Sequence, residues 1–166
     1  DDNRVRLAPD NFLARARELV ATLKGAAQAG TADADAFQLI SRRRMHMMNS
    51  WLAETSMTMM KNAQGDHIHL NKGDCERLDI GNGERVKVQS ETGSIEAIAQ
   101  LTADVRPGVA VMEYGWGNRS FDPATCEVSQ QRGVYSNSLV SRTELDPLSC
   151  VPALNGSRIR VAKLAV

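Results

Sequence analysis

The chain has 166 residues, of which 42% are hydrophobic, and its 20 lysine and arginine residues balance 20 aspartate and glutamate residues. This length and apolar fraction are enough for one ordinary globular domain with a real hydrophobic core. A formal net charge of zero creates no overall field that would attract nucleic acid. We therefore expect no nucleic-acid partner, and any anion site must be local.

The cysteines and the hydropathy bear on the compartment. Cys75, Cys126 and Cys150 are far apart and odd in number, so they form neither a CxxC metal pattern nor a complete disulfide framework. We interpret them as free, mostly buried thiols, which favours a cytoplasmic location. No apolar run approaches the roughly 20 residues that span a bilayer, so membrane insertion is not expected. Because the chain lacks an initiator Met, we expect Asp1 to be a boundary within a longer protein.

The first part of the chain predicts a helix and a linker. Apolar residues recur at helical spacing over residues 11–25, and Gly25 is expected to end the helix. Residues 26–35 are rich in Ala, Gly, Thr and Asp without periodicity, which is typical of a linker. We therefore divide the chain into a docking helix with its linker, residues 1–35, and a main domain, residues 36–166.

The main domain begins with two short apolar segments. Residues 37–40 predict a buried strand that ends in a basic, Met-rich loop, and residues 67–70 predict a second strand. Asn71 then begins a capped helical turn, which the glycines at 81 and 83 end.

The remaining segments complete a set of short strands. Residues 86–101 alternate apolar and polar side chains around a Thr-Gly turn and predict a hairpin. Residues 109–112 predict an apolar strand, and residues 159–164 a closing strand. Between them, residues 118–155 form a long polar segment that we expect to wrap a ligand. Five or six short strands with small helices between them indicate a mixed β-barrel, because closure removes the exposed sheet edges.

Five segments follow one another in an order that carries more information than any one of them. They are residues 39–43 with 49–51, residues 71–74 with 78–83, residues 84–93, residues 105–109 with 115–117, and residues 136–139 with 145–149 and 152–156. In this order they resemble the molybdopterin-dinucleotide-binding domain that ends the large subunits of the dimethyl sulfoxide reductase and formate dehydrogenase superfamily. The likeness runs from Leu7 to about Ala162.

The resemblance implies a fold and a function. The fold is mainly β with short helices: a double-psi six-stranded β-barrel, preceded here by the N-terminal helix. The function is to hold one molybdopterin guanine dinucleotide, part of a bis-molybdopterin guanine dinucleotide cofactor with Mo or W. Electron or oxygen-atom transfer would be performed by the full-length enzyme, since the cofactor supplies the hard chemistry. The implied partners are the remaining domains of the same subunit and electron-transfer subunits.

Some residues depart from the family pattern. Met47 and Met48 stand where small polar residues are usual, Glu113 and Tyr114 stand where a Pro-His pair is common, and Cys150 replaces a Gly. These departures motivate an alternative function: a stand-alone β-barrel interaction or assembly module that has lost cofactor binding.

Arg42, Arg43 and Arg44 supply positive charge where the first strand ends. A pterin dinucleotide presents a pyrophosphate, a guanine edge and a polar pterin, which require local cations, backbone N–H groups and amide or carboxylate side chains. We therefore assign all three arginines to the cofactor site. The alternative is a solvated basic loop or salt bridges to neighbouring carboxylates.

Three polar residues of the following loop are further candidates. His46 could hydrogen-bond the pterin or a phosphate, or could be a loop histidine without a ligand. Asn49 and Ser50 can both donate and accept hydrogen bonds, although capping of a short helix would explain them equally well.

Two later loops complete the predicted site. Gly115 would let the backbone approach a planar ligand with Trp116 packed beneath it, or the pair could form a turn anchored by a buried Trp. Asn137 has the amide needed to pair with pterin nitrogens, whereas loop Asn residues more often sit in turns.

We expect no catalytic residue and no metal site in this chain. It has no GxSxG, HExxH or P-loop motif. His67 and His69 have a spacing that can bind metal, but without a third ligand nearby we interpret them as structural. The methionines are expected to pack against other domains; they are Met45, Met47, Met48, Met57, Met59 and Met60.

Overall fold

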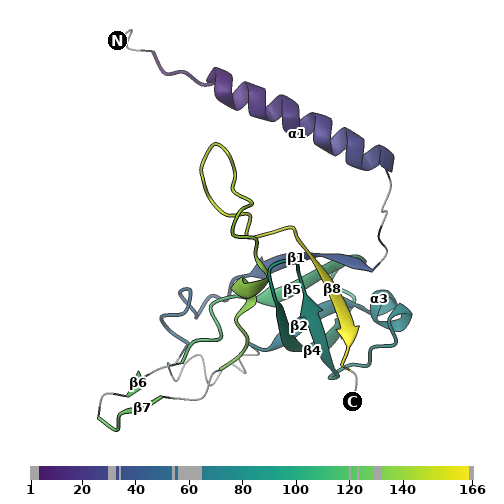
Figure 1. Cartoon of the computed structure of the whole chain (residues 1–166), viewed down its shortest axis with the longest axis vertical. Helices are drawn as coiled ribbons and strands as arrows, with labels where there is room; N and C mark the ends of the chain where they lie inside the picture. Colours follow the sequence, from purple (N-terminus) through teal and green to yellow (C-terminus); the bar gives the residue numbers. More distant parts are fainter. Residues whose placement is uncertain are drawn as a thin grey trace.

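The structure is a computed structural model (Figure 1) that describes residues 4–29, 33, 35–53, 55, 65–119, 121–122, 124–128 and 132–164. Met57, Met59 and Met60, three of the methionines expected at a docking surface, lie outside the described residues.

Six strands close into a barrel in the order β1-β5-β2-β4-β3-β8. Their bounds are β1 Ala36–Arg42, β2 His67–Asn71, β3 Arg85–Gln89, β4 Ser94–Thr102, β5 Val109–Glu113 and β8 Ser157–Lys163. The β1–β5 and β2–β4 pairs are parallel, and the other four pairings are antiparallel. This confirms the expected mainly β fold, a six-stranded double-psi barrel preceded by a helix.

The barrel interior is the hydrophobic core, and strand alternation fills it. In β3 exposed and buried residues alternate, with Val86 and Val88 fully buried, because successive side chains of a strand point to opposite faces. Each of the six barrel strands contributes buried residues; the core comprises Phe37, Leu39, Ile68, Leu70, Cys75, Ile80, Val86, Val88, Ala97, Ala99, Ala110, Met112, Leu139, Ile159 and Val161.

The predicted capped turn is the helix α3, Lys72–Arg77. Asn71 Oδ1 accepts the Gly73 N–H at 2.9 Å, while Asn71 Nδ2 donates to the Val105 carbonyl at 2.7 Å. The cap therefore also fixes the chain that leads into β5.

The expectation of mostly buried thiols is wrong for two of the three cysteines. Cys75 is buried, but Cys126 and Cys150 are exposed. Cys126 and Cys150 lie in surface turns, with positive φ angles of 57° and 56°. Their exposure therefore follows from the turns that hold them. All three thiols are free, as expected.

The long polar segment before β8 is only partly irregular. It contains the two-residue strands β6, Phe121–Asp122, and β7, Glu127–Val128, and the 3-10 helix η1, Ser136–Leu139. In Figure 1 the β6–β7 hairpin projects away from the barrel, whereas η1 lies against it. Within this segment η1 is therefore packed on the barrel and the β6–β7 hairpin is not.

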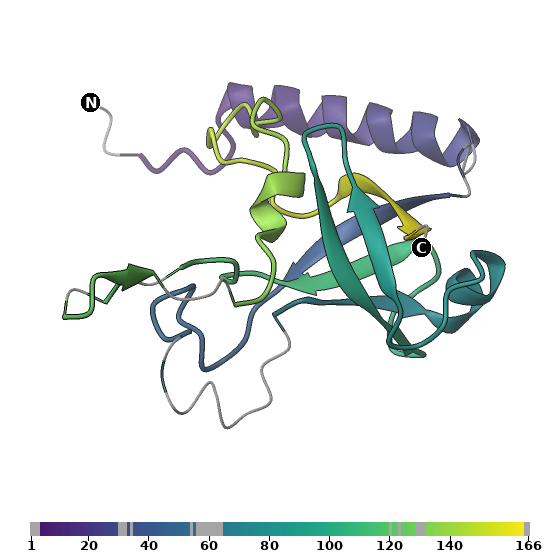
Figure 2. The same cartoon turned by 60° about the horizontal axis from the view of Figure 1, so that its bottom comes forward.

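The N-terminal helix α1, Asp10–Ala29, extends four residues beyond the predicted end. Gly25 does not end the helix because the following residues are mostly alanines, which favour a helix, and one internal Gly costs only about 1 kcal/mol. Figure 1 and Figure 2 show α1 outside the barrel, and in Figure 1 it stands apart from the six strands. Its apolar side chains are largely exposed; they include Phe12, Leu13, Leu19, Val20 and Leu23.

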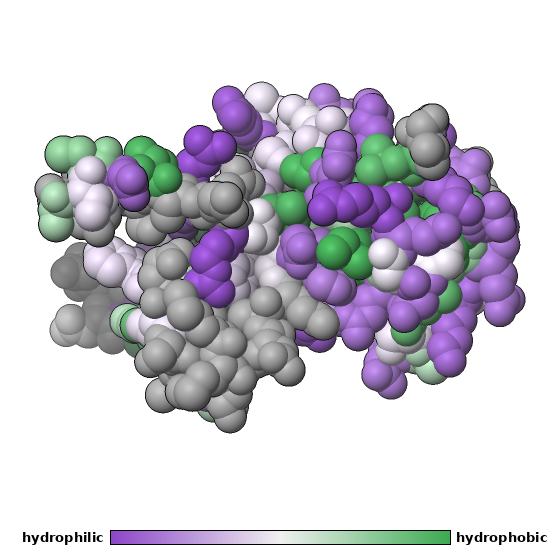
Figure 3. All heavy atoms as spheres, turned by 90° about the horizontal axis from the view of Figure 1, so that it is seen from below, coloured by the Kyte–Doolittle hydropathy of each residue, from purple (hydrophilic) through white to green (hydrophobic). Residues whose placement is uncertain are grey.

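The exposed helix face contrasts with the barrel. On the face in Figure 3, hydrophilic side chains prevail among the visible described residues of the barrel, and the hydrophobic ones form small separate areas. Single hydrophobic side chains are common on protein surfaces, whereas an uncovered apolar stripe along a helix is typical of a surface that packs against another domain or protein. That α1 docks on other domains remains a prediction.

We predict that Leu70→Ala lowers the free energy of unfolding by roughly 2–5 kcal/mol, because Leu70 has no exposed surface in the barrel core. The same substitution at Leu23, which is 68% exposed on α1, is the matched control and should change stability by less than about 0.5 kcal/mol. Urea unfolding followed by circular dichroism measures both. Equal losses for the two variants would contradict a core confined to the barrel.

Candidate cofactor-binding site

The candidate site lies where two parallel strands end together. β1 and β5 pair in parallel with Arg42 opposite Glu113, so the loops that follow both strands leave the same end of the barrel (Figure 2). Topology therefore brings together two loops, residues 43–53 and 114–118, that are distant in sequence.

Two of the three predicted arginines bind one buried carboxylate. Arg42 Nη2 and Arg44 Nε each donate to Glu113 Oε1 at 2.8 Å, and the Glu113 side chain is only 2% exposed. Arg42 and Arg44 thus form salt bridges to a neighbouring carboxylate, which was the alternative to a cofactor role considered for the arginines from the sequence. The guanidinium of Arg43 instead lies over the Tyr114 ring, 5.7 Å from its centroid.

Three adjoining hollows between these loops form what we call the loop groove. Their volumes are about 370, 390 and 440 Å³, and all three share Asn49 and Tyr114. Most of the predicted site residues line the groove: Arg43, Arg44, Asn49, Ser50, Gly115, Trp116 and Asn137. Residues predicted from three separate sequence segments therefore meet at one surface.

Gly115 is required where the two loops cross. Its φ is +91°, and a Cβ at this position would lie 2.3 Å from the Asn49 carbonyl oxygen, closer than atoms can approach. A side chain here would push the loops apart.

Trp116 anchors the groove from below. It is 3% exposed and forms a second small core with Met47 and Ala53. Arg132 lies over its ring at 5.7 Å and donates to the Ala53 carbonyl at 2.8 Å. The anchored-turn interpretation of Trp116 therefore holds, although the ring also lines one hollow.

The polar side chains of the groove are accessible. Tyr114 Oη donates to Asn49 Oδ1 at 3.0 Å near the surface, and Asn137 is exposed on η1. These groups can present hydrogen-bond donors and acceptors to a bound ligand.

Two predicted site residues do not line the groove. Arg42 points towards Glu113 and His69, and His46 is half-buried in the turn after β1. The groove also contains residues that the sequence did not single out as ligands: Ser41, Tyr114, Asn118, Tyr135, Leu154 and Asn155. Asn155 belongs to the last family segment, and its Oδ1 accepts the Ser41 N–H at 2.8 Å, so that segment was the available signal.

The paired histidines have partners. His67 Nδ1 lies 2.7 Å from Asp66 Oδ1, and His69 Nε2 lies 3.1 Å from Arg42 Nη2. Across the described residues, no group of three or more His, Cys, Asp or Glu side chains is placed to hold a metal ion. Burial, and next the charge of Arg42, lower the pKa of His69 below its ordinary value of 6.5.

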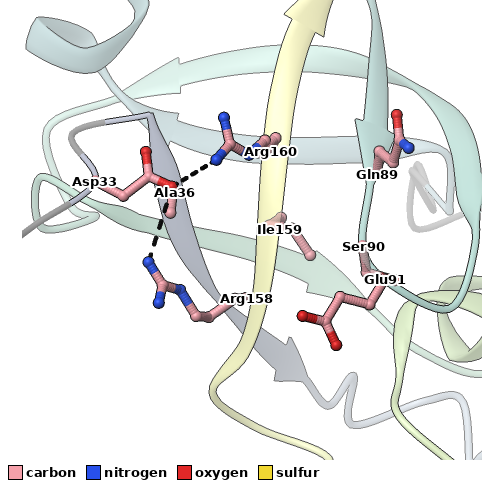
Figure 4. Close-up of a pocket in the computed structure, with 8 residues that line it drawn as sticks. All are labelled: Asp33, Ala36, Gln89, Ser90, Glu91, Arg158, Ile159 and Arg160. Atoms are coloured by element: carbon pink, nitrogen blue, oxygen red, sulfur yellow. Dashed lines mark hydrogen bonds and ion pairs between the residues drawn. The ribbon is translucent and has the colours of Figure 1, made fainter.

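A larger hollow of about 490 Å³ lies elsewhere on the barrel, beside β8 (Figure 4). Its two arginines, Arg158 and Arg160, already lie 3.9 and 2.6 Å from Asp33 Oδ2. Figure 4 also shows Glu91 on the opposite side of the hollow. Two carboxylates face two guanidiniums there, so this hollow has no clear excess of positive charge for a pyrophosphate.

Comparison with known proteins assigns the family. The family model "Molydopterin dinucleotide binding domain" matches residues 37–158, which is more than half of the chain. The barrel is therefore a domain of the molybdopterin-dinucleotide-binding class, and the chain belongs to this family.

Two relatives are large enzyme subunits. The chain is 40% identical over 96 residues to the arsenate respiratory reductase molybdopterin-containing subunit ArrA of Chrysiogenes arsenatis, covering 56% of this chain and 11% of that one. It is 30% identical over 97 residues to the F420-dependent formate dehydrogenase subunit alpha of Methanocaldococcus jannaschii, covering 58% and 12%. The chain thus spans about a ninth to an eighth of the length of the curated relatives that it matches.

Among solved structures, acetylene hydratase from Pelobacter acetylenicus aligns with a TM-score of 0.63 at 17% identity. The alignment covers 77% of this chain and 18% of that chain, and it supports the fold. Of the helices in the described ranges, none combines the length and hydropathy needed to cross a bilayer.

We predict that wild-type stability falls as pH drops from about 7.5 through the ordinary His pKa to about 5, and that His69→Gln lacks this component. Because the pKa of His69 is lowered in the folded chain, the unfolded chain takes up this proton at a higher pH than the folded chain does. Acid therefore favours unfolding until the pH falls below the folded pKa. Urea unfolding at several pH values measures the effect. Parallel pH profiles for the two proteins would rule it out.

Proposed function

We propose that this domain holds one molybdopterin guanine dinucleotide in the loop groove, as part of a molybdenum or tungsten oxidoreductase. The observation that carries the proposal is the convergence of seven of the nine predicted cofactor residues on three adjoining hollows. The family match supports the same cofactor class.

The chemistry of the groove fits the cofactor. Arg43 offers a guanidinium to the pyrophosphate, the group for which charge-assisted hydrogen bonds are strongest. Asn49, Ser50 and Asn137 offer hydrogen-bonding groups to the guanine and pterin edges. The half-buried Tyr114 borders all three hollows, and its ring gives a planar ligand an aromatic neighbour.

The role of the chain is binding and orientation. When bound, the cofactor and its metal supply the electron or oxygen-atom transfer that the full-length enzyme performs. The residues of this domain exclude water from one side of the dinucleotide and fix its position.

The remaining domains of the same subunit are the proposed partners, with electron-transfer subunits beyond them. Support comes from the two relatives, because the stretch that aligns with this chain covers only 11% and 12% of their length. Exposed apolar side chains next to the groove, Met45 at 91%, Met48 at 69% and Trp51 at 83% exposure, together with the α1 stripe, suit packing against those domains. A cytoplasmic location is proposed from the free thiols.

A second candidate function is a barrel that mediates assembly without a cofactor. The exposed Met45, Met48 and Trp51 favour it, because an apolar surface suits a protein partner as well. The neutralisation of Arg42 and Arg44 by Glu113 also reduces the charge available to an anion. Cofactor titration separates the two candidates.

We predict that molybdopterin guanine dinucleotide stabilises the chain in a saturable way, because a ligand that binds only the folded state raises its stability. Arg43→Ala should weaken binding about tenfold or more, the loss expected for a hydrogen bond to a charged group. Asn137→Ala should weaken it by a smaller factor. Calorimetry and thermal shift measure both effects.

Arg158→Ala is the matched control, because it removes an exposed arginine outside the groove. It should leave the dissociation constant within about twofold of wild type. If neither the purified chain nor its intact parent protein binds the full cofactor, the assembly module is the correct function.

A further inference from the structure

Glu113 is a buried carboxylate at the end of β5, and the proposed function does not use it. Its side chain is 2% exposed. Oε1 accepts from both Arg42 Nη2 and Arg44 Nε at 2.8 Å, and Oε2 accepts from Trp116 Nε1 at 3.3 Å. Burying a carboxylate costs several kcal/mol unless such partners compensate it, so the charge depends on this set of donors.

The three donors come from both walls of the loop groove. Arg42 ends β1, Arg44 lies in the loop 43–53 that follows it, and Trp116 belongs to the loop after β5. The walls also meet through the second core, where Trp116 packs with Met47 and Ala53. Glu113 thus joins two loops that the sequence separates by about seventy residues.

The placement of Arg43 follows from this arrangement. Alternate residues of an extended chain point to opposite sides, so fixing Arg42 and Arg44 on Glu113 directs the residue between them the other way. Arg43 accordingly lies over Tyr114 and lines two of the three hollows. Of the three arginines, Arg43 is thus the one that makes no ion pair with Glu113, and it lines two hollows where Arg44 lines one.

We propose that Glu113 is the positioning residue of the loop groove: by holding Arg42, Arg44 and Trp116 it sets the spacing of the walls and turns Arg43 towards the bound anion. The inference rests on the proposed function and assigns Glu113 no contact with the cofactor. Preorganisation of this kind improves affinity because the ligand does not have to order the loops.

We predict that Glu113→Gln raises the dissociation constant for molybdopterin guanine dinucleotide about tenfold, the lower range for loss of an outer-shell partner. The direction of the change in the dissociation constant distinguishes two roles for Glu113. Removing a negative charge near a pyrophosphate would by itself tighten binding, so a purely electrostatic role gives the opposite result. Calorimetry well below the unfolding temperature measures the constant.

Asp33→Asn is the matched control, since it also removes one carboxylate that pairs with two arginines, outside the groove (Figure 4). It should leave affinity within about twofold of wild type. Arg42→Ala, which changes a residue that does not line the groove, should weaken binding through Glu113. The double variant with Arg42→Ala and Glu113→Gln should raise the dissociation constant by less than the product of the two single-variant factors. If Glu113→Gln does not fold, Arg42→Ala alone tests the positioning role.

A readout without cofactor separates the inference from the function on which it rests. In the NMR spectrum of the unliganded chain, Glu113→Gln should move the Trp116 indole N–H resonance and speed its exchange with solvent, whereas Asp33→Asn should not. Absence of dinucleotide binding by the wild-type chain refutes the proposed function. Wild-type binding that Glu113→Gln leaves unchanged or tightens refutes the positioning role alone.

Discussion

The parallel pairing of β1 with β5 is the constraint on which the site depends. It places the carboxyl ends of both strands at one end of the barrel and sets Arg42 opposite Glu113. An antiparallel pairing would send the two loops to opposite ends, and no groove would form between them. Closure of the barrel fixes this pairing, since β1 is also held by β8 and β5 by β2.

Much of the barrel could be predicted from the sequence because strand periodicity is local. Val86 and Val88 alternate with charged residues, and their burial follows directly from a half-exposed strand. The end of α1 could not be predicted in this way, because Gly25 is a stop signal whose small cost the following alanines outweigh. Nor could the exposure of Cys126 and Cys150, which turn geometry sets.

The site was only partly predictable, for a different reason. The order of the family segments pointed to Arg43, Asn49 and Asn137, and all three line the groove. The Arg42–Glu113 pair joins residues that are 71 positions apart, so only the strand register could reveal it. The sequence gives the number of arginines in the run, but their ion pairs with carboxylates determine which guanidinium groups are available to a ligand.

The departures from the family pattern bear on whether the groove is still a binding site. Met47 is buried against Trp116, Glu113 binds two arginines and the indole, and Tyr114 contacts both Arg43 and Asn49. These three unusual residues are thus satisfied by residues of the two strand ends and their loops, whereas Met48 and Cys150 are exposed.

A surface that has lost its ligand is under no such constraint, because its polar groups can be satisfied by water and its loops can vary independently. Here a Cβ on Gly115 would still collide with the Asn49 carbonyl, and a buried carboxylate would lose one of its two guanidinium partners if either arginine changed alone. Such mutual dependence keeps the two loops together as one unit, which the proposed dinucleotide site requires.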